Sequence, residues 1–194
     1  MKGCRPLTDK EVQEVARCFR GRYAARDKAL FLLGLKTGFR ISELLSLRLA
    51  DVFSAGKMVD RVTVPRRHMK KKLEGRTVLL HPEAKAALAA WIAEMQQAAP
   101  VAADTSLFRS QKSAHQPIGR RHAWRVLRRV FDAQALTGPL GTHSMRKTFA
   151  HRVYEKLDRD LLKTQRAMGH KNINSTVAYL SFREEEIDAA ILEI

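Results

Sequence analysis

Apolar side chains recur at helical spacing near the start of the chain. Thr8 and Glu11 have the spacing of a capping box, and the apolar residues behind them share one helix face, so we predict a first helix that begins at Asp9. A second helix is expected from about Ala24, and Gly38 is suited to the left-handed turn at its end. The apolar residues that follow predict another short helix.

The pattern changes between Val52 and Leu80. Residues 61–65 and 76–80 alternate apolar and polar side chains, which is typical of half-buried strands. We expect these two segments to pair as a small antiparallel sheet. The turn between them is strongly cationic and contains Arg66, Arg67, Lys70, Lys71 and Lys72.

Helical spacing returns after Pro82, a residue that favours the first position of a helix. A further amphipathic helix is predicted over residues 120–133, with Trp124, Leu127 and Phe131 on its apolar face and arginines on another face. Short helices are expected in the remainder, with breaks near residues 138–141, 158–160 and 169–174.

The pattern as a whole indicates the α+β class. With 194 residues, of which 45% are hydrophobic, we expect one mainly α-helical domain over residues 1–194 with a small antiparallel β-sheet. No apolar run of about 18 residues predicts a membrane span, and the N-terminus lacks the apolar segment of a signal peptide. The 2 cysteines are too few for a disulfide framework, which favours a reducing cytoplasm.

Positive charge is in large excess. The chain has 36 Lys and Arg against 20 Asp and Glu, a formal net charge of +16 and a pI of about 10.4. Lys and Arg that neutralise phosphates release bound counterions, which makes nucleic acid the best match to this charge. We therefore expect nucleic acid as the partner and no membrane.

Three segments contain residues suited to phosphate chemistry. His143 and Arg146, in the sequence GTHSMRKTF, are three positions apart and share one face of a helix. His170 follows a glycine, and Tyr179 comes nine residues later. Arg40 lies upstream, in the sequence TGFRISEL. Taken alone, each has an ordinary structural explanation: Tyr179 as a packed surface tyrosine, for example, and Arg40 as a cation at a helix end.

In this order the segments resemble the tyrosine recombinase (phage-type integrase) family, over nearly the whole chain from about Leu7 to Ile194. The resemblance implies the family's catalytic-domain fold, that of DNA breaking and rejoining enzymes. Relatives usually carry an N-terminal core-binding domain, which we expect to be absent here. Lys147 stands where many relatives have a second histidine.

The resemblance also implies roles for residues. Tyr179 would be the nucleophile, Arg40 and Arg146 would bind the phosphate, His143 would be the general base and His170 would hydrogen-bond the phosphate. A free tyrosine has a pKa of about 10, so forming its phenolate at pH 7 costs roughly 4 kcal/mol, which a base and nearby cations must offset. No metal and no cofactor is expected, because side chains supply the positive charge.

The general acid is expected on the cationic turn. We favour Lys70, with Lys72 as the alternative, although runs of lysines are more often solvated turns. Glu43 is expected to orient Arg40. We expect further basic residues to contact DNA: Arg66, Arg67, Lys71, Lys72, Arg121, Arg125 and Arg128. For the three arginines of residues 120–133, the alternative is an ordinary exposed helix face.

The function that the resemblance implies is site-specific recombination, in which strands of double-stranded DNA are cleaved and rejoined through a 3′-phosphotyrosyl intermediate. A homo-oligomer on DNA, a synaptic tetramer, is the expected assembly, and the bacterial nucleoid or a phage-infected cell is the expected place. Two alternatives remain: a catalytically silent DNA-binding regulator with the same fold, and a nicking and closing enzyme similar to type IB topoisomerases.

Overall fold

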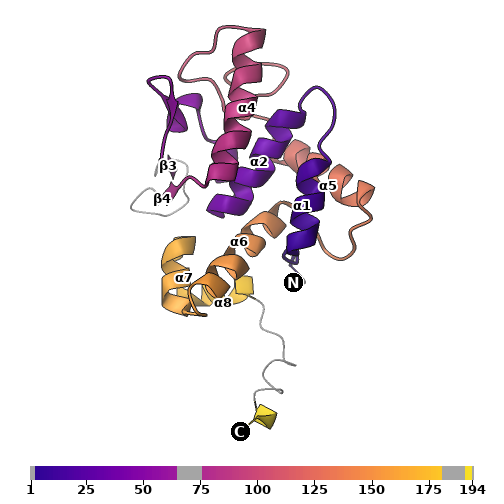
Figure 1. Cartoon of the computed structure of the whole chain (residues 1–194), viewed down its shortest axis with the longest axis vertical. Coiled ribbons are helices and arrows are strands. Elements are labelled where there is room, and N and C mark those ends of the chain that lie inside the picture. The colour runs from indigo at the N-terminus through magenta and orange to yellow at the C-terminus, as the bar shows by residue number, and fades with distance from the viewer. Residues whose placement is uncertain (1–2, 65–75, 181–190, 194) are drawn as a thin grey trace. The chain divides into compact units, whose positions relative to one another are not determined.

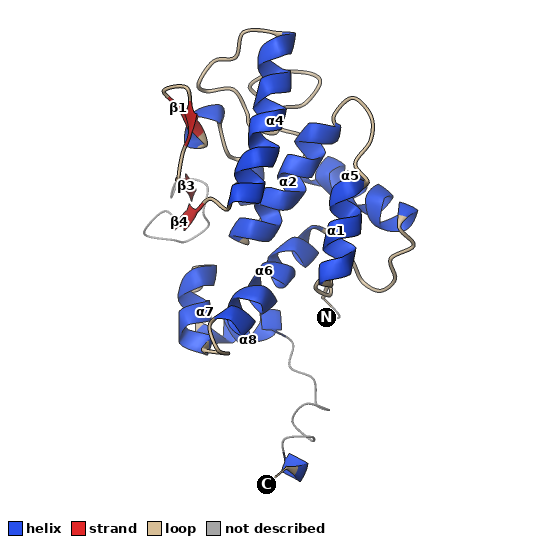
Figure 2. Ribbon diagram, in the orientation of Figure 1, coloured by secondary structure: helices blue, strands red, loops and turns tan. Residues whose placement is uncertain are grey.

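The computed structural model describes residues 3–64, 76–180 and 191–193 (Figure 1). The chain divides into two compact units, a first unit of Met1–Phe149 and a second unit of Ala150–Ile194. Figure 2 shows that helices dominate the described residues, as the α+β prediction requires. The elements are α1 (Asp9–Arg17), α2 (Ala24–Thr37), α3 (Ile41–Leu45), η1 (Leu49–Asp51), β1 (Phe53–Ser54), β2 (Lys57–Met58), β3 (Arg61–Val64), β4 (Arg76–Leu79), α4 (Pro82–Ala98), α5 (Arg120–Ala133), α6 (Thr142–Lys156), α7 (Leu161–Met168) and α8 (Ile173–Leu180).

Helix α2 is the centre of the first unit. It packs most extensively against α4 and also contacts α1, α3 and α5 (Figure 1). Apolar side chains occupy its whole circumference, and the stretch from Ala29 to Leu35 is buried throughout. A helix that is apolar on all sides belongs in a protein interior. Packing on all sides therefore fixes the end of α2, from which the following residues extend.

The ends of α1 and α2 are those that the sequence predicts. Thr8 and Glu11 form a reciprocal capping box at the start of α1. At the end of α2, Gly38 has a φ of 61° and donates its backbone N–H to the carbonyl of Gly34. A Cβ atom on Gly38 would also collide with the ring of Phe149, so this position requires glycine for both its conformation and its space.

The expected strand pair is present. Strands β3 and β4 are antiparallel, with Val62 opposite Val78 and Val64 opposite Arg76. The structure adds a second hairpin, β1 and β2, whose turn at Ala55 and Gly56 has φ angles of 48° and 74°. The sequence did not predict this hairpin because strands of 2 residues are too short to show an alternating pattern.

Helix α5 has the predicted bounds and, except at Trp124, the predicted apolar face. Leu127 and Phe131 are fully buried, whereas Trp124 remains 49% exposed. The assignment of Trp124 to the core was wrong. Its position on the helix is at the border between the buried face and the arginine face, so spacing alone does not decide on which side it falls.

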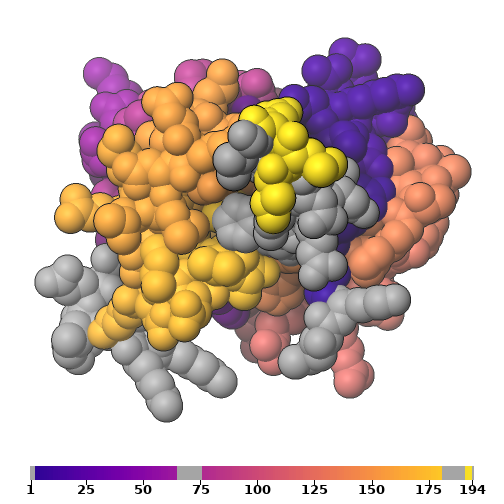
Figure 3. Space-filling model, turned by 90° about the horizontal axis from the view of Figure 1, so that it is seen from below, coloured from indigo at the N-terminus to yellow at the C-terminus, as the bar shows by residue number. Residues whose placement is uncertain are grey.

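The second unit comprises the later part of α6 together with α7 and α8. Asp160 caps α7 by accepting a hydrogen bond from the backbone N–H of Lys163, and Gly169 ends α7 with a φ of 62°. Figure 3 shows the side chains of α7 and α8 (orange to gold) in space-filling form. No helix among the described residues is long and apolar enough to cross a membrane.

Candidate active site

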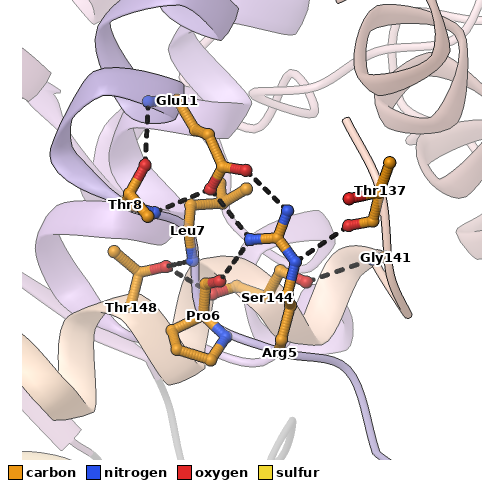
Figure 4. Close-up of polar contacts among 9 residues, drawn as sticks. All are labelled: Arg5, Pro6, Leu7, Thr8, Glu11, Thr137, Gly141, Ser144 and Thr148. Atoms are coloured by element: carbon orange, nitrogen blue, oxygen red, sulfur yellow. Dashed lines mark hydrogen bonds and ion pairs between the residues drawn. The ribbon is translucent and has the colours of Figure 1, made fainter. Parts of the chain in front are cut away.

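The N-terminal segment holds the start of α6 in place (Figure 4). Arg5 donates a hydrogen bond from Nε to the carbonyl of Thr137, at 2.9 Å, in the loop that leads into α6. The backbone N–H of Leu7 donates to the hydroxyl of Thr148, at 2.8 Å, on the helix itself. The first two turns of α6, which carry the expected catalytic histidine and arginine, are thereby tied to the body of the first unit.

The backbone on either side of Arg40 and the carboxylate of Glu43 position its side chain. The left-handed conformation of Gly38 redirects the chain, and Arg40 follows in extended conformation as the N-cap of α3. The buried carboxylate of Glu43 accepts the backbone N–H of Arg40 at 2.7 Å and its Nη1 at 3.0 Å. This confirms the predicted contact between Glu43 and Arg40. The Arg40 side chain stays 37% exposed, so its orientation is fixed while it remains accessible to a ligand.

Two further guanidinium groups meet beside Arg40. Arg146, which is 1% exposed, donates a hydrogen bond from Nη1 to the carbonyl of Gly38. Arg76 on β4 donates to the same carbonyl at 3.4 Å and to that of Thr37 at 2.7 Å. Burial, and secondarily the charge of Arg146, lowers the pKa of Arg76 to about 9, so the group is still charged at neutral pH. Three arginines therefore concentrate positive charge around the end of α2.

His143 lies at the surface on the first turn of α6. Partial burial lowers its pKa below the ordinary value of about 6.5, and the nearby charges of Arg146 and Arg40 lower it further. The imidazole is therefore neutral at pH 7 and able to accept a proton. His143, Arg40 and Arg146 form one group in the first unit.

The remaining two expected residues belong to the second unit. His170 is 8% exposed, and its Nδ1 is 3.0 Å from the hydroxyl of Thr176 on α8. Its ring centroid is 5.3 Å from that of Tyr179, and the two planes are inclined by 36°. Gln165 donates its side-chain amide to the carbonyl of His170 at 3.1 Å, which fixes the backbone of this turn. Tyr179 is half-buried, three residues after Thr176 on the same face of α8.

The expected DNA-contacting residues divide into two sets. Arg121 and Arg125 are exposed on α5, whereas Arg128 forms an ion pair with Asp132 that offsets part of its charge. The residues of the cationic turn lie outside the described residues: Arg66, Arg67, Lys70, Lys71 and Lys72. Across residues 3–64, 76–180 and 191–193, no group of three or more His, Cys, Asp or Glu side chains is arranged as a metal site.

Sequence reasoning missed two residues of this site. Arg76 was treated only as part of a strand, although a charged residue facing the buried side of a strand is a signal that it has a partner inside. Thr176 has no such signal, because a threonine at helical spacing from a tyrosine is common. Its contact with His170 depends on the turn between α7 and α8.

Comparison with known proteins identifies the family. Residues 5–186 match the phage integrase family. The chain is 30% identical over 165 residues to the "Probable integrase/recombinase YoeC" of Bacillus subtilis and covers 82% of that protein. It is 26% identical over 182 residues to the tyrosine recombinase XerD of Halalkalibacterium halodurans but spans only 56% of that longer protein.

Solved structures agree with these similarities. The site-specific recombinase XerH, in its pre-cleavage complex with its difH substrate, matches 96% of this chain with a TM-score of 0.72 and 25% identity, and the match covers 53% of XerH. The XerA recombinase has the same fold, with a TM-score of 0.75 at 19% identity. On the extent of the family match and the likeness to YoeC, the chain belongs to the phage integrase family, the tyrosine recombinases.

Proposed function

We propose that this chain is the catalytic domain of a site-specific DNA recombinase that cleaves and rejoins strands of double-stranded DNA. Membership of the phage integrase family supports the proposal, as do relatives named as recombinases. The observation that carries it is the group formed by Arg40, Arg146 and His143, in which burial and the charges of the two arginines lower the pKa of His143. A protein that only binds DNA needs basic faces but has no use for a neutral base beside two phosphate-binding arginines.

The proposed reaction is a phosphoryl transfer to a side chain. The phenolic oxygen of Tyr179 attacks the scissile phosphorus, its proton passes to a base, and a covalent bond forms between the tyrosine and the 3′-phosphate. The bond from phosphorus to the 5′-oxygen breaks, and that oxygen takes a proton from a general acid and leaves as a 5′-hydroxyl. A 5′-hydroxyl of a partner strand then attacks the phosphotyrosine, which restores the phosphodiester and the free tyrosine. The bond energy is conserved, so no external energy source is needed.

Each expected residue has a role in this scheme. Arg40 and Arg146 would neutralise the non-bridging oxygens, because planar guanidinium groups donate paired hydrogen bonds to phosphate. His143 would take the proton of Tyr179, and His170 would hydrogen-bond the phosphate. Lys70 would be the general acid, with Lys72 as the alternative. Since arginines and lysine supply the positive charge, the scheme requires no metal ion.

The wider setting is part of the proposal. Arg121 and Arg125 on α5, together with the cationic turn, would bind the DNA backbone. Strand exchange needs two DNA sites, so the chain would act as a homo-oligomer on DNA, with a synaptic tetramer as the active form. The relatives named above come from bacteria, which supports action on DNA in the bacterial cytoplasm as part of the proposal.

A nicked duplex that contains a candidate target site tests the proposal, because the nick lets the cut fragment diffuse away and traps the covalent adduct. Wild type is expected to give a protein–DNA band that survives denaturation. Tyr154→Phe, a control variant that removes the hydroxyl of another tyrosine in the same unit, is expected to give the same band. Tyr179→Phe is expected to bind the same DNA and give no such band. An adduct in Tyr179→Phe would exclude this nucleophile. DNA bound by wild type without any adduct would favour a silent regulator, and supercoil relaxation without strand exchange would favour topoisomerase-like activity.

A further inference from the structure

Trp124 is an exposed aromatic side chain in the middle of a basic surface. It is 49% exposed, while Leu127 and Phe131 on the buried face of α5 have no exposure at all. One exposed apolar residue is ordinary on a protein surface and needs no explanation by itself. Trp124 differs because Arg120 and Arg121 precede it by one helical turn, so that cations and the indole share one patch.

The indole also forms one wall of a hollow in the first unit. This hollow has a volume of about 360 Å³ and is lined by Ile41, Arg120, Arg121, Trp124, Thr142 and His143. Trp124 is held in position by packing on the loop before α6, since a Cβ atom on Gly141 would lie 3.6 Å from its indole. The hollow contains the proposed general base, and its Ile41 directly follows Arg40, so it adjoins the place where the phosphate would bind.

We infer that this hollow binds a nucleobase next to the scissile phosphate, with the face of the base stacked on the indole of Trp124. Aromatic planes combined with arginines are the chemistry that recognises bases outside the double-helical stack. A base in an intact duplex has both faces covered by its neighbours. Cleavage creates a strand end at which a base loses one neighbour, and leaving the stack there costs less. The hollow would hold that strand end while it waits for rejoining.

This inference rests on the proposed function, because the strand end arises from cleavage. It goes beyond that function by assigning a base-binding subsite and a residue that governs the fate of the cut strand. The sugar–phosphate contacts of Arg120 and Arg121 would orient the nucleotide, and Trp124 would supply contact with the base that is tolerant of sequence.

Tryptophan fluorescence gives a direct test. The chain has 2 tryptophans, and Trp91 is 3% exposed with its Nε1 donating to the carbonyl of Leu107 at 2.7 Å, so DNA can reach Trp124 but not Trp91. In the Tyr179→Phe protein, a nicked duplex is expected to quench the emission more strongly than an intact duplex of the same sequence at equal saturation. Quenching that is equal on both duplexes, or absent from both, would overturn the inference.

Substitutions at position 124 complete the test. Trp124→Leu is expected to weaken binding to the nicked duplex by about tenfold relative to the intact one, and Trp124→Phe to restore most of the loss, because the phenyl ring still stacks. Leu79→Ala is the control, because it removes an apolar side chain outside the hollow that is even more exposed than Trp124 (61% against 49%), and it should change the affinity for neither duplex. An equal loss for Trp124→Leu on both duplexes would also overturn the inference.

Covalent adduct formation by wild type is measured on the same DNA and separates this inference from the proposed function. Preferential quenching without any adduct would leave the base-binding hollow standing and reject the recombinase. An adduct without preferential quenching would reject the base-binding hollow and leave the recombinase proposal standing.

Discussion

Arg76 and Arg146 donate hydrogen bonds to the same acceptor, the backbone carbonyl of Gly38. One guanidinium comes from strand β4 and the other from helix α6, and Arg40, the N-cap of α3, follows two residues after the shared carbonyl. Burial lowers the pKa of Arg76 most, and the charges of Arg146 and Arg40 lower it further. Arg76 also lies over the rings of Phe39 and Phe149, at 5.1 and 5.8 Å from their centroids. It is therefore placed to hold Arg40 and Arg146, the proposed phosphate-binding arginines, in position without itself reaching the phosphate.

Arg76→Met is expected to slow adduct formation by about 100-fold, because small displacements of groups that bind the reacting phosphate have effects of this size. DNA affinity should change little, since Arg76 is only 7% exposed. Arg76→Lys keeps the charge and one donor and should recover part of the rate. Single-turnover cleavage and DNA binding are measured side by side. A loss of affinity as large as the loss of rate would show that Arg76 acts through binding instead.

Gly38→Ala is expected to destabilise the protein by about 2–4 kcal/mol, because it adds strain at a positive φ to a collision with the ring of Phe149. Gly56→Ala is the matched control: Gly56 also has a positive φ, 74°, but a Cβ atom there would meet nothing. That variant should lose only about 1 kcal/mol. Urea unfolding measures both. Equal losses would mean that the contact with Phe149 contributes nothing.

The sequence predicted most of the helices and strands because the patterns that mark them involve residues close together along the chain. The capping box at Thr8, the glycine at position 38 and the helix over residues 120–133 depend on neighbours within one or two turns. The hairpin of β1 and β2 was missed because its strands are too short to alternate. Trp124 was misplaced because it lies at the border of an amphipathic helix, where packing decides.

The site was predictable only as far as the resemblance to tyrosine recombinases extended. That resemblance gave roles to Arg40, His143, Arg146, His170 and Tyr179, whereas local spacing placed only His143 and Arg146 together, on one helix face, and gave them no role. No pattern in the sequence indicates the contacts between segments that are far apart along the chain. Arg76 reaches the end of α2 from 38 residues away along the chain, and its partners there are backbone carbonyls, which leave no trace in the choice of side chain.

The pKa of His143 is expected to rise when Arg40 is replaced by methionine. The charge of Arg40 disfavours the imidazolium, so removing it makes protonation easier and moves the pKa toward 6.5. The shift should be small, because burial contributes most and Arg146 more than Arg40. NMR titration of the imidazole measures it without requiring activity. Arg48→Met makes the same change in net charge elsewhere and should leave the titration as in wild type; an identical shift in that variant would indicate a general charge effect.

Thr176→Val is expected to slow adduct formation by about tenfold. Valine has nearly the same shape but cannot hydrogen-bond Nδ1 of His170, so the ring loses the contact that sets its orientation beside Tyr179. Thr164→Val is the control, since this buried threonine of α7 donates to the carbonyl of Asp160 and loses a hydrogen bond of the same kind. Both variants should lose about 1 kcal/mol of stability, and only Thr176→Val should lose activity. Equal rates in the two would show that the contact has no part in catalysis.

The ion pair of Arg5 and Glu11 makes the anchoring of the N-terminal segment dependent on pH. Hydrogen bonds from Arg5 lower the pKa of Glu11 from its ordinary value of 4.5 to about 2. Because the folded state holds the ionised form, the stabilisation is complete above pH 4.5 and is lost as the pH falls from there toward 2. Glu11→Gln isolates this effect, since glutamine still serves the capping box at Thr8 but carries no charge. Both side chains are partly exposed, so we expect a difference of about 1 kcal/mol in unfolding free energy at pH 7, smaller in high salt. The difference should shrink at pH 3. A difference that stays constant between these pH values would mean that the charge of Glu11 does not hold the segment in place.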